Sequence, residues 1–414
     1  MKSTLLVFFM LIALTSPLAH ALRGQVVDDA NGRPLAGAVV VRGTEVVTTN
    51  QEGAYNFVGN GGTIAARAIG YRRAMLTLAN SATEAPPLRL MAFRPKALYL
   101  TFWGIGDRHI RGAALDIARS TEINALVIDV KGDRGWIPYP SHVKLAETIG
   151  ARGTTTVKDM PALIAQLKAL GLYLIARVVV FKDDPLASAH PEWAVKTAHG
   201  TPYRDREGLG WTDAGRPEVW AYNLDIAEEA AQLGFDEIQF DYLRFPDAVG
   251  LTFAEPNTEE KRVAAISGFL AAARKRLAPY NVFIAGDIFG YVLWNENDTY
   301  IGQKLEALET SLDYISPMLY PTGFHLGIPG YVDPVAHPRE IVQLTLEHAI
   351  HRTHLSPLRF RPWLQSFRDY AFDRRNFGGP EIRLQIDGAE KVGTDGWMFW
   401  NPHNTYTSDG LKKK

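Results

Sequence analysis

The strongest constraint on the fold is a series of eight short apolar stretches between Lys96 and Pro402, separated by segments with helical spacing. Parallel strands that are covered on both faces are nearly uniformly apolar, and these stretches have that character. Eight strands alternating with helices predict an α/β fold built on a closed (β/α)₈ TIM barrel. The predicted strands span residues 97–104, 125–131, 172–181, 235–241, 282–289, 314–320, 360–367 and 396–401.

The intervening segments support a barrel covered by helices. Residues 160–170 and 219–233 each place their apolar side chains on one helical face, as expected for helices that pack on a sheet. Pro217 stands just inside the start of the second helix and Gly234 just past its end, which is the usual punctuation of a helix.

The first 21 residues have the three parts of a secretory signal peptide. Lys2 precedes an apolar run at 5–14, and the small residues Ala19 and Ala21 predict cleavage after Ala21. The run is about half of the roughly 20 apolar residues that span a bilayer, so we expect export and no stable membrane insertion after cleavage. The sequence contains no cysteine, which excludes disulfides and a lipidated amino-terminal cysteine. It predicts a periplasmic or secreted protein.

Charge and aromatic content bear on the partner. The 44 basic and 45 acidic residues nearly cancel, and no block of like charge would follow a phosphate backbone, so nucleic acid is not an expected partner. Aromatic residues make up 11% of the chain, and no Trp precedes Trp103. The aromatic surface suited to stacking on sugars or packing a core therefore belongs to the predicted barrel.

Residues 22–93 show short alternating stretches separated by turn residues, which predict a small β-sandwich ahead of the barrel at 94–414. This segment resembles the carboxypeptidase regulatory-like family, which implies a non-catalytic accessory domain. The resemblance is carried by Gly24-x-Val26, Gly32-x-Pro34-Leu35-x-Gly37-Ala38-x-Val40, Thr49-x-x-x-Gly53-x-Tyr55-x-Phe57 and Gly70-Tyr71.

Asp241 ends the fourth predicted strand, in which Glu237, Gln239 and Asp241 alternate. If their shared face is the barrel interior, Asp241 emerges at the carboxyl ends of the strands, where such barrels carry their chemistry. The structural alternative is an ion pair with Arg244 or Lys131 that orders the rim. A buried carboxylate is rarely a net stabiliser even when it is paired, which favours a catalytic role.

Asp287 occupies the matching place on the next predicted strand. Adjacent strands lie about 4.8 Å apart, so the two carboxylates would approach the roughly 5 Å separation of a retaining glycosidase. The apolar residues after Asp287 suit a protonated general acid, whereas Arg244 would hold Asp241 ionised as the nucleophile. Side-chain direction can reverse these roles, and a turn or helix cap is the structural alternative for Asp287.

Further side chains at the predicted strand ends are candidates for binding substrate. Asp129 and Lys131 stand at alternate positions of the second strand and would face the same way as a charge pair. This pair would either form hydrogen bonds with sugar hydroxyls or have a purely structural role. Arg177 on the third strand has as its default role a partner for one of the acids. Aromatic faces with a few fixed polar groups form sugar subsites. The remaining candidates for substrate binding are Trp103, Arg244, Tyr320, Trp400, Gln365 and Asn401.

The barrel region carries a second resemblance. Its motifs are Val-Ile-Asp-Val-Lys at 127–131, Ala-Arg-Val-Val-Val-Phe-Lys-Asp at 176–183, His-Pro-Glu-Trp at 190–193, Phe-Asp-Tyr-Leu-Arg-Phe-Pro at 240–246, Tyr-Ile-Ser-Pro-Met-Leu-Tyr-Pro at 314–321 and Gly-Trp-Met-Phe-Trp at 396–400. From about residue 97 to 406 the chain resembles a bacterial family of glycoside hydrolase barrels and, more distantly, α-amylase-like barrels. The latter keep a nucleophilic Asp after the fourth strand and an acid after the fifth, which the resemblance assigns to Asp241 and Asp287. Their acid is usually Glu, and Gln239 stands where they have Arg.

The expected function is therefore hydrolysis of a poly- or oligosaccharide by a carboxylate pair, with a retaining outcome. Metal and cofactor are not expected, because the histidines lie in loops or beyond a helix and no Gly-rich phosphate loop follows a strand. The alternative function is a non-catalytic carbohydrate-binding protein of the cell envelope.

Overall fold

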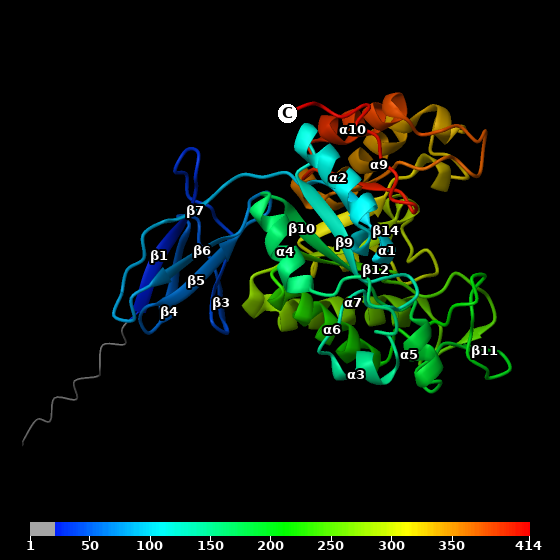
Figure 1. Ribbon diagram of the computed structural model, residues 1–414, viewed down its shortest axis with the longest axis horizontal. Helices are drawn as coiled ribbons and strands as arrows, with labels where there is room; N and C mark the ends of the chain where they lie inside the picture. Colours follow the sequence, from blue (N-terminus) through cyan, green and yellow to red (C-terminus); the bar gives the residue numbers. More distant parts are fainter. Residues whose placement is uncertain (1–20) are drawn as a thin grey trace, which may run out of the picture.

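The computed structural model describes residues 21–414, so the predicted signal peptide lies outside the described residues except for Ala21. Eight parallel strands close into a barrel, with each strand beside its successor along the chain and the last beside the first, which confirms the predicted (β/α)₈ fold. Figure 1 shows the barrel at the centre of the larger body. Its strands are β8 (Lys96–Leu100), β9 (Ala125–Lys131), β10 (Tyr173–Val179), β12 (Glu237–Asp241), β14 (Phe283–Phe289), β15 (Tyr314–Met318), β16 (Trp363–Gln365) and β17 (Trp397–Trp400).

Several observed strands are shorter than the predicted ones at their carboxyl ends. Strand β8 ends at Leu100 because Thr101 caps helix α1 (Phe102–Gly106), and the Thr101 hydroxyl accepts a hydrogen bond from the backbone N–H of Gly104 at 3.0 Å. This cap is typical of Thr before a helix. The chain thus turns away from the barrel axis before Trp103.

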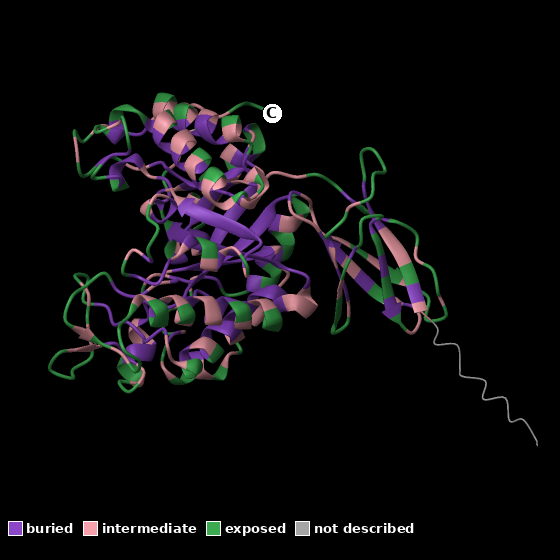
Figure 2. Ribbon diagram, turned by 180° about the vertical axis from the view of Figure 1, so that it is seen from behind, coloured by how far each residue is buried: buried purple, intermediate pink, exposed green. Residues whose placement is uncertain are grey.

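Helices surround the barrel, and Figure 2 shows buried strands inside partly exposed helices. The predicted helix at 219–233 is confirmed as α6, which has Pro217 as its first residue and is followed by Gly234 at a φ of +99°. No helix within residues 21–414 combines the length and apolarity needed to cross a bilayer. The other helices are α2 (Arg108–Ser120), α3 (Lys144–Thr148), α4 (Met160–Ala169), α5 (Asp184–Ala189), α7 (Glu259–Leu277), α8 (Leu305–Leu308), α9 (Pro338–Thr353) and α10 (Gly379–Val392).

The lower part of the barrel interior holds a buried charged layer. Arg361 donates to both carboxylate oxygens of Glu237 at 2.7 and 2.6 Å and to Asp395 at 2.6 Å. The Tyr173 hydroxyl also donates to Glu237 at 2.9 Å. Glu237 faces inward, as the alternation on β12 predicts, so Asp241 two pleats further along faces inward too.

The amino-terminal segment forms two packed antiparallel or mixed sheets, which confirms the predicted β-sandwich. Its assignment to an accessory family stays a prediction. One sheet has the order β4-β1-β7 and the other β3-β2-β5-β6. The strands are β1 (Ala21–Asp28), β2 (Val39–Arg42), β3 (Glu45–Thr48), β4 (Ala54–Val58), β5 (Gly62–Arg67), β6 (Ala74–Leu78) and β7 (Leu88–Leu90).

The sandwich docks on the amino ends of the barrel strands (Figure 1). Ile69 and Phe93 pack against the apolar cluster inside the barrel. Arg73 forms an ion pair of 2.9 Å with Asp236, which precedes β12. The sandwich therefore closes the bottom of the barrel and leaves the carboxyl ends of the strands open for chemistry.

Candidate active site

Arg177 is the centre of the charged layer at the carboxyl ends of the strands. Its side chain is completely buried and forms ion pairs with Asp129 at 2.7 Å, Asp133 at 2.7 Å and Asp241 at 2.5 Å. The register explains the cluster, because Arg177 on β10 lies beside Asp129 on β9 and two residues before the partner of Asp241 on β12. Arg177 also packs against the rings of Tyr99 and Trp400, with its guanidinium 5.3 and 4.9 Å from their centroids.

Asp129 is the most deeply enclosed of the three carboxylates. It accepts hydrogen bonds from the Tyr99 hydroxyl at 2.8 Å and from the backbone N–H of Phe102 at 3.0 Å. Burial raises the pKa of Asp129 to about 6, although the neighbouring Arg177 charge acts in the opposite direction. Asp129 therefore contributes both to the rim and to the ion-pair cluster, as a partner of Arg177.

Asp241 reaches solvent at a small cavity of about 190 Å³ in the mouth of the barrel. Its side chain remains 11% exposed, and one carboxylate oxygen is held by Arg177. The other oxygen accepts from the backbone N–H of Tyr242 at 2.5 Å, where a φ of +47° turns the chain at the end of β12. The cavity is lined by Arg177, Asp241, Tyr242, Arg244, Phe289, Met318, Tyr320, Trp363 and Trp400.

Asp287 is buried, with 1% exposure, and is not among the residues that line this cavity. Phe240 and Gly286 are register partners on β12 and β14, so Asp241 and Asp287 follow at equal height on strands about 4.8 Å apart. One oxygen of Asp287 accepts from the Trp363 indole N–H at 2.7 Å, and the other has no partner within residues 21–414. Burial, reinforced by the charge of Asp241, raises the pKa of Asp287 well above its usual value. The geometry thus gives an ion-paired carboxylate beside one whose protonated form is favoured by burial.

Aromatic side chains form the walls of the cavity. Trp400 stacks on Tyr99 with ring centroids 4.1 Å apart, and Trp363 meets Trp400 edge-on at 5.6 Å. Burial raises the pKa of Tyr320 well above its usual value, and the charges of Asp287 and Asp241 add to that effect. Tyr320 and Trp400 are thus brought to the site that their strand-end positions predict.

The sequence analysis does not identify Tyr99, Asp133, Tyr242, Met318 and Trp363 as site residues. Tyr99 and Trp363 face inward on strands β8 and β16. The period of two along each strand carries this information once one inward-facing residue is known. Asp133 lies in the loop after β9, and no pattern in the sequence indicates that it turns back to Arg177.

Two further cavities lie near the central one. One of about 800 Å³ shares Phe289, Met318 and Tyr320 with it, and continues over the loops after β14 and β15. Another of about 190 Å³ is lined by Asp129, Asp133 and the 54% exposed Trp103, and both of these acids bond to Arg177 of the central cavity. Trp103 and Asp129 are therefore near Asp241 but in a separate part of the mouth.

Arg244 does not hold Asp241 as the sequence analysis expects. It lines the cavity, but its hydrogen bond runs from Nη1 to the backbone carbonyl of Phe245 at 3.0 Å. The arginine that pairs with Asp241 is Arg177, because residues on adjacent strands with the same inward direction meet, whereas Arg244 lies beyond the turn at Tyr242.

Lys131 does not face the same way as Asp129, so the expected charge pair is wrong. The register of β9 against β10 shifts between Asp129 and Lys131, which pair with consecutive residues of β10. This β-bulge turns Lys131 outward, where it forms an ion pair with Asp183 at 2.6 Å and donates to Asn223 of α6 at 2.9 Å. Lys131 is completely buried outside the barrel and has no place in the site.

Gln365 and Asn401 serve the loops and do not line the cavity. The Gln365 amide donates to the Thr322 hydroxyl at 2.7 Å, and its oxygen accepts from the Thr322 backbone N–H at 3.1 Å. Asn401 donates to the carbonyls of Ser366 at 2.5 Å and Thr405 at 2.9 Å. These buried amides are consumed by local hydrogen bonds, which corrects their assignment as substrate-binding groups.

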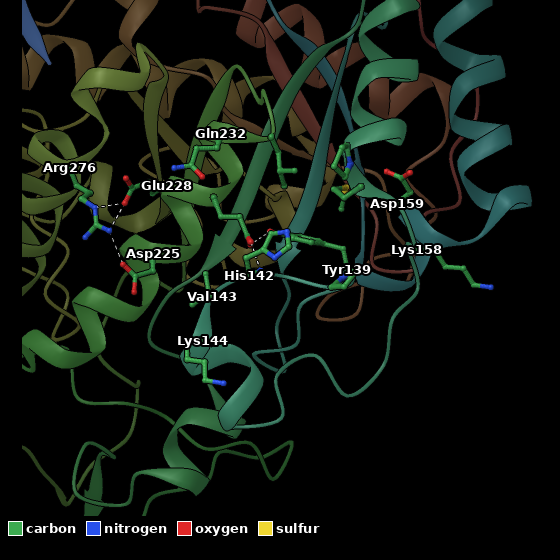
Figure 3. A pocket seen from close by; sticks show the side chains of 15 residues that line it. Tyr139, His142, Val143, Lys144, Lys158, Asp159, Asp225, Glu228, Gln232 and Arg276 are labelled. Atoms are coloured by element: carbon green, nitrogen blue, oxygen red, sulfur yellow. Dashed lines mark hydrogen bonds and ion pairs between the residues drawn. The ribbon is translucent and has the colours of Figure 1, made fainter. Parts of the chain in front are cut away.

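A cavity of about 650 Å³ is lined by residues of the loop after β9, of α4 and of α6 (Figure 3), and Asp241 is not among its lining residues. Its acids are bonded within the protein. Glu229 accepts from the Tyr139 hydroxyl at 2.9 Å, and Arg276 pairs with Asp225 at 2.8 Å and with Glu228. Nothing in this arrangement leaves a carboxylate for acid or base chemistry. No group of three acidic or histidine side chains suited to a metal occurs in residues 21–414.

Comparison with known proteins supports the sequence interpretation of the barrel. The family model described as "Putative glycosyl hydrolase domain" matches residues 97–406. No curated protein matches the chain.

Solved structures give a more distant comparison. A hypothetical protein from Ruminiclostridium thermocellum ATCC 27405 is 37% identical, with 46% of this chain and 96% of that chain covered and a TM-score of 0.42. The glycoside hydrolase domain of PgaB (BpsB) from Bordetella bronchiseptica is 15% identical, with 78% and 99% covered and a TM-score of 0.57. The second comparison shows a shared barrel fold.

Proposed function

We propose that this chain, which belongs to the glycosyl hydrolase family that matches residues 97–406, cleaves glycosidic bonds of a poly- or oligosaccharide with Asp241 and Asp287. The observation that carries the proposal is the contrast between two acids at equal height on neighbouring strands. Asp241 is ion-paired with Arg177, whereas burial raises the pKa of Asp287 and so favours its protonated form. Acids whose surroundings separate their protonation states are the arrangement that glycoside hydrolysis needs.

In the proposed mechanism Asp287 acts first as general acid. It gives its proton to the glycosidic oxygen as the bond to the leaving sugar breaks, and Asp241 attacks the anomeric carbon to form a glycosyl-enzyme ester. The ionised Asp287 then removes a proton from water, which attacks the same carbon and releases Asp241. The strand spacing of about 4.8 Å supports this retaining route, because inversion needs room for water between the acids.

The unpartnered oxygen of Asp287 is the group available for proton transfer. Because Asp287 is 1% exposed, the transfer has to reach the sugar through the cavity floor beside Trp363, whose indole holds the other oxygen. The same contact fixes the direction in which the acid points.

A polymeric substrate is supported by two further cavities near the one that Asp241 lines. The 800 Å³ cavity and the one that contains Trp103 extend the binding surface beyond the central cavity. Aromatic faces such as the half-exposed Trp103 indole suit the apolar faces of sugar rings.

The test is a screen of polysaccharides with the purified mature chain, in which released reducing ends are measured. Wild type should cleave at least one polymer, and Asp241→Asn and Asp287→Asn should each reduce turnover by at least about 100-fold. The matched control is Asp116→Asn, which changes an exposed carboxylate on α2 and should leave turnover unchanged. Turnover equal to wild type in Asp241→Asn would exclude the mechanism, and binding without any turnover in wild type would favour the carbohydrate-binding alternative.

A substrate with an activated leaving group distinguishes the general acid, Asp287, from the nucleophile, Asp241. Asp287→Asn should regain much of its rate on an aryl glycoside whose phenol leaves without protonation, whereas Asp241→Asn should not. Equal rescue of both variants would contradict the assignment.

We further propose that the enzyme acts in the periplasm or outside the cell, on the basis of the predicted signal peptide. Fractionation of expressing cells with amino-terminal sequencing tests this, and a mature chain that begins at Leu22 is the expected result. Retention of the whole chain in the cytoplasm would contradict it.

A further inference from the structure

Arg244 differs from the other arginines inside the barrel in having no acidic partner. Arg177 bonds to three carboxylates and Arg361 to two, and in both cases nearby acids hold the arginine pKa well above its usual value against the effect of burial. Arg244 forms no ion pair with any residue in 21–414 and has one hydrogen bond, to the neighbouring carbonyl. Burial lowers its pKa. The charges of Asp241 and Asp247 act against this effect without forming an ion pair, so the Arg244 guanidinium keeps donors for an anionic partner.

Three aromatic rings surround this guanidinium. Its carbon lies 4.9 Å from the Trp211 centroid, 4.8 Å from that of Phe289 and 5.3 Å from that of Tyr242. Contacts with ring faces use the flat sides of a guanidinium and leave its N–H edge unoccupied. The rings pack around the side chain, while Nε and Nη2 make no hydrogen bond within residues 21–414 and remain able to donate.

Because of its position, Arg244 would present these N–H donors to the reacting sugar or to the neighbouring sugar. Arg244 lines the same 190 Å³ cavity as Asp241, from which it is separated by the turn at Tyr242. A planar fork of N–H donors matches a carboxylate in two parallel hydrogen bonds. Arg177, the other arginine that lines this cavity, is already paired with three carboxylates, so Arg244 is the cation left to meet an anionic group of the substrate there.

We propose that Arg244 binds the carboxylate of a uronic acid residue next to the cleaved bond, so that the substrate is an acidic polysaccharide. This inference rests on the proposed function and specifies its substrate class. Asp247 lines the larger cavity, and its charge and that of Asp241 both raise the pKa of Arg244 against the effect of burial. The carboxylate of the sugar would then complete the set of partners that Arg177 and Arg361 already have.

The test compares a uronic-acid polysaccharide with the same polymer after its carboxyl groups have been reduced to neutral alcohols. Wild type should show kcat/KM about 10- to 100-fold higher on the acidic polymer, the range expected for charge-assisted hydrogen bonds. Arg244→Met should lose most of that preference, and Arg244→Lys should retain part of it as a point charge. The control Arg119→Met, at an exposed position on α2, should behave as wild type. A sulfated neutral polymer, used as a further arm, should be a poorer substrate than the carboxylated one.

Binding measured by calorimetry with acidic and reduced oligosaccharides separates this inference from the proposed function. Equal affinity of wild type for both forms, or an equal loss of both in Arg244→Met, overturns the carboxylate site even if hydrolysis is observed. A preference for the acidic form that disappears in Arg244→Met supports the site even if no polymer is cleaved, in which case only the hydrolase proposal fails. Thermal unfolding of each variant shows that the fold is retained.

Discussion

Replacing Arg177 with Met tests whether one buried cation holds the charged layer of the site together. Its ion pairs with Asp129, Asp133 and Asp241 span 2.5–2.7 Å. Removing one partner of a buried ion pair destabilises a protein by about 3–5 kcal/mol, because the remaining charge stays buried and unpaired. Asp133 and Asp241 retain contact with solvent, with side chains 38% and 11% exposed, so Asp129 sets the size of the effect. We expect a loss of about 3–5 kcal/mol in the free energy of unfolding at pH 7.

The loss should be smaller at pH 5. Burial already raises the pKa of Asp129 from 3.8 to about 6 in the folded wild type, and removal of Arg177 raises it further. A group with a raised folded pKa gives stability that is present below its unfolded pKa and is lost as the pH rises through the folded value. In Arg177→Met the folded pKa of Asp129 is higher, so the contribution of Asp129 to the free energy of unfolding continues to fall above pH 6. In wild type that contribution has levelled off there. The difference between the two proteins should therefore grow by up to about 1.4 kcal/mol from pH 5 to pH 7.

Urea unfolding at both pH values, followed by tryptophan fluorescence and circular dichroism, measures the effect. Arg119→Met, with an exposed side chain, should change stability by less than about 0.5 kcal/mol. A loss below about 1 kcal/mol for Arg177→Met at pH 7, or a greater loss at pH 5, would refute the reasoning, since either result means that the acids do not depend on Arg177.

Three further changes test other parts of the structure. Lys131→Met should lower the free energy of unfolding in urea by about 3–5 kcal/mol, because it leaves the buried Asp183 unpaired. The KM of the folded variant should stay unchanged, and an altered KM would place Lys131 in the site. Trp103→Ala should raise KM for polymer about 2- to 10-fold without lowering the melting temperature, and unchanged KM would exclude Trp103 as a sugar platform. Phe93→Ala should destabilise the protein measurably in the same urea titration, but by less than the roughly 3–5 kcal/mol that truncation of a fully buried Phe costs. An unchanged unfolding midpoint would show that the sandwich does not close the barrel.

The barrel can be predicted from the sequence because its strands are apolar on both faces. The stretch at 125–131 matches β9 at both ends, and the predicted helix at 160–170 matches α4 to within one residue. Strand ends are less predictable, since the end of β8 depends on the Thr101 cap, which competes with strand continuation.

The candidate active site can be predicted from the sequence only in part. Alternation along β12 is enough to turn Asp241 inward, and Arg177 meets it through the register of β10 and β12. Alternation fails at Lys131, because a bulge inserts one residue into β9 and reverses the direction of every side chain beyond it. Proximity in sequence also misleads for Arg244, whose three-residue separation from Asp241 contains the turn at Tyr242.

The stereochemistry of the first product tests the carboxylate pair most directly. With a substrate identified by the screen, proton NMR of the anomeric signals in the first minutes of reaction distinguishes the two outcomes before mutarotation mixes them. Attack by Asp241 followed by water predicts a product with the anomeric configuration of the substrate. A first product of inverted configuration would contradict a nucleophilic Asp241 next to an acidic Asp287.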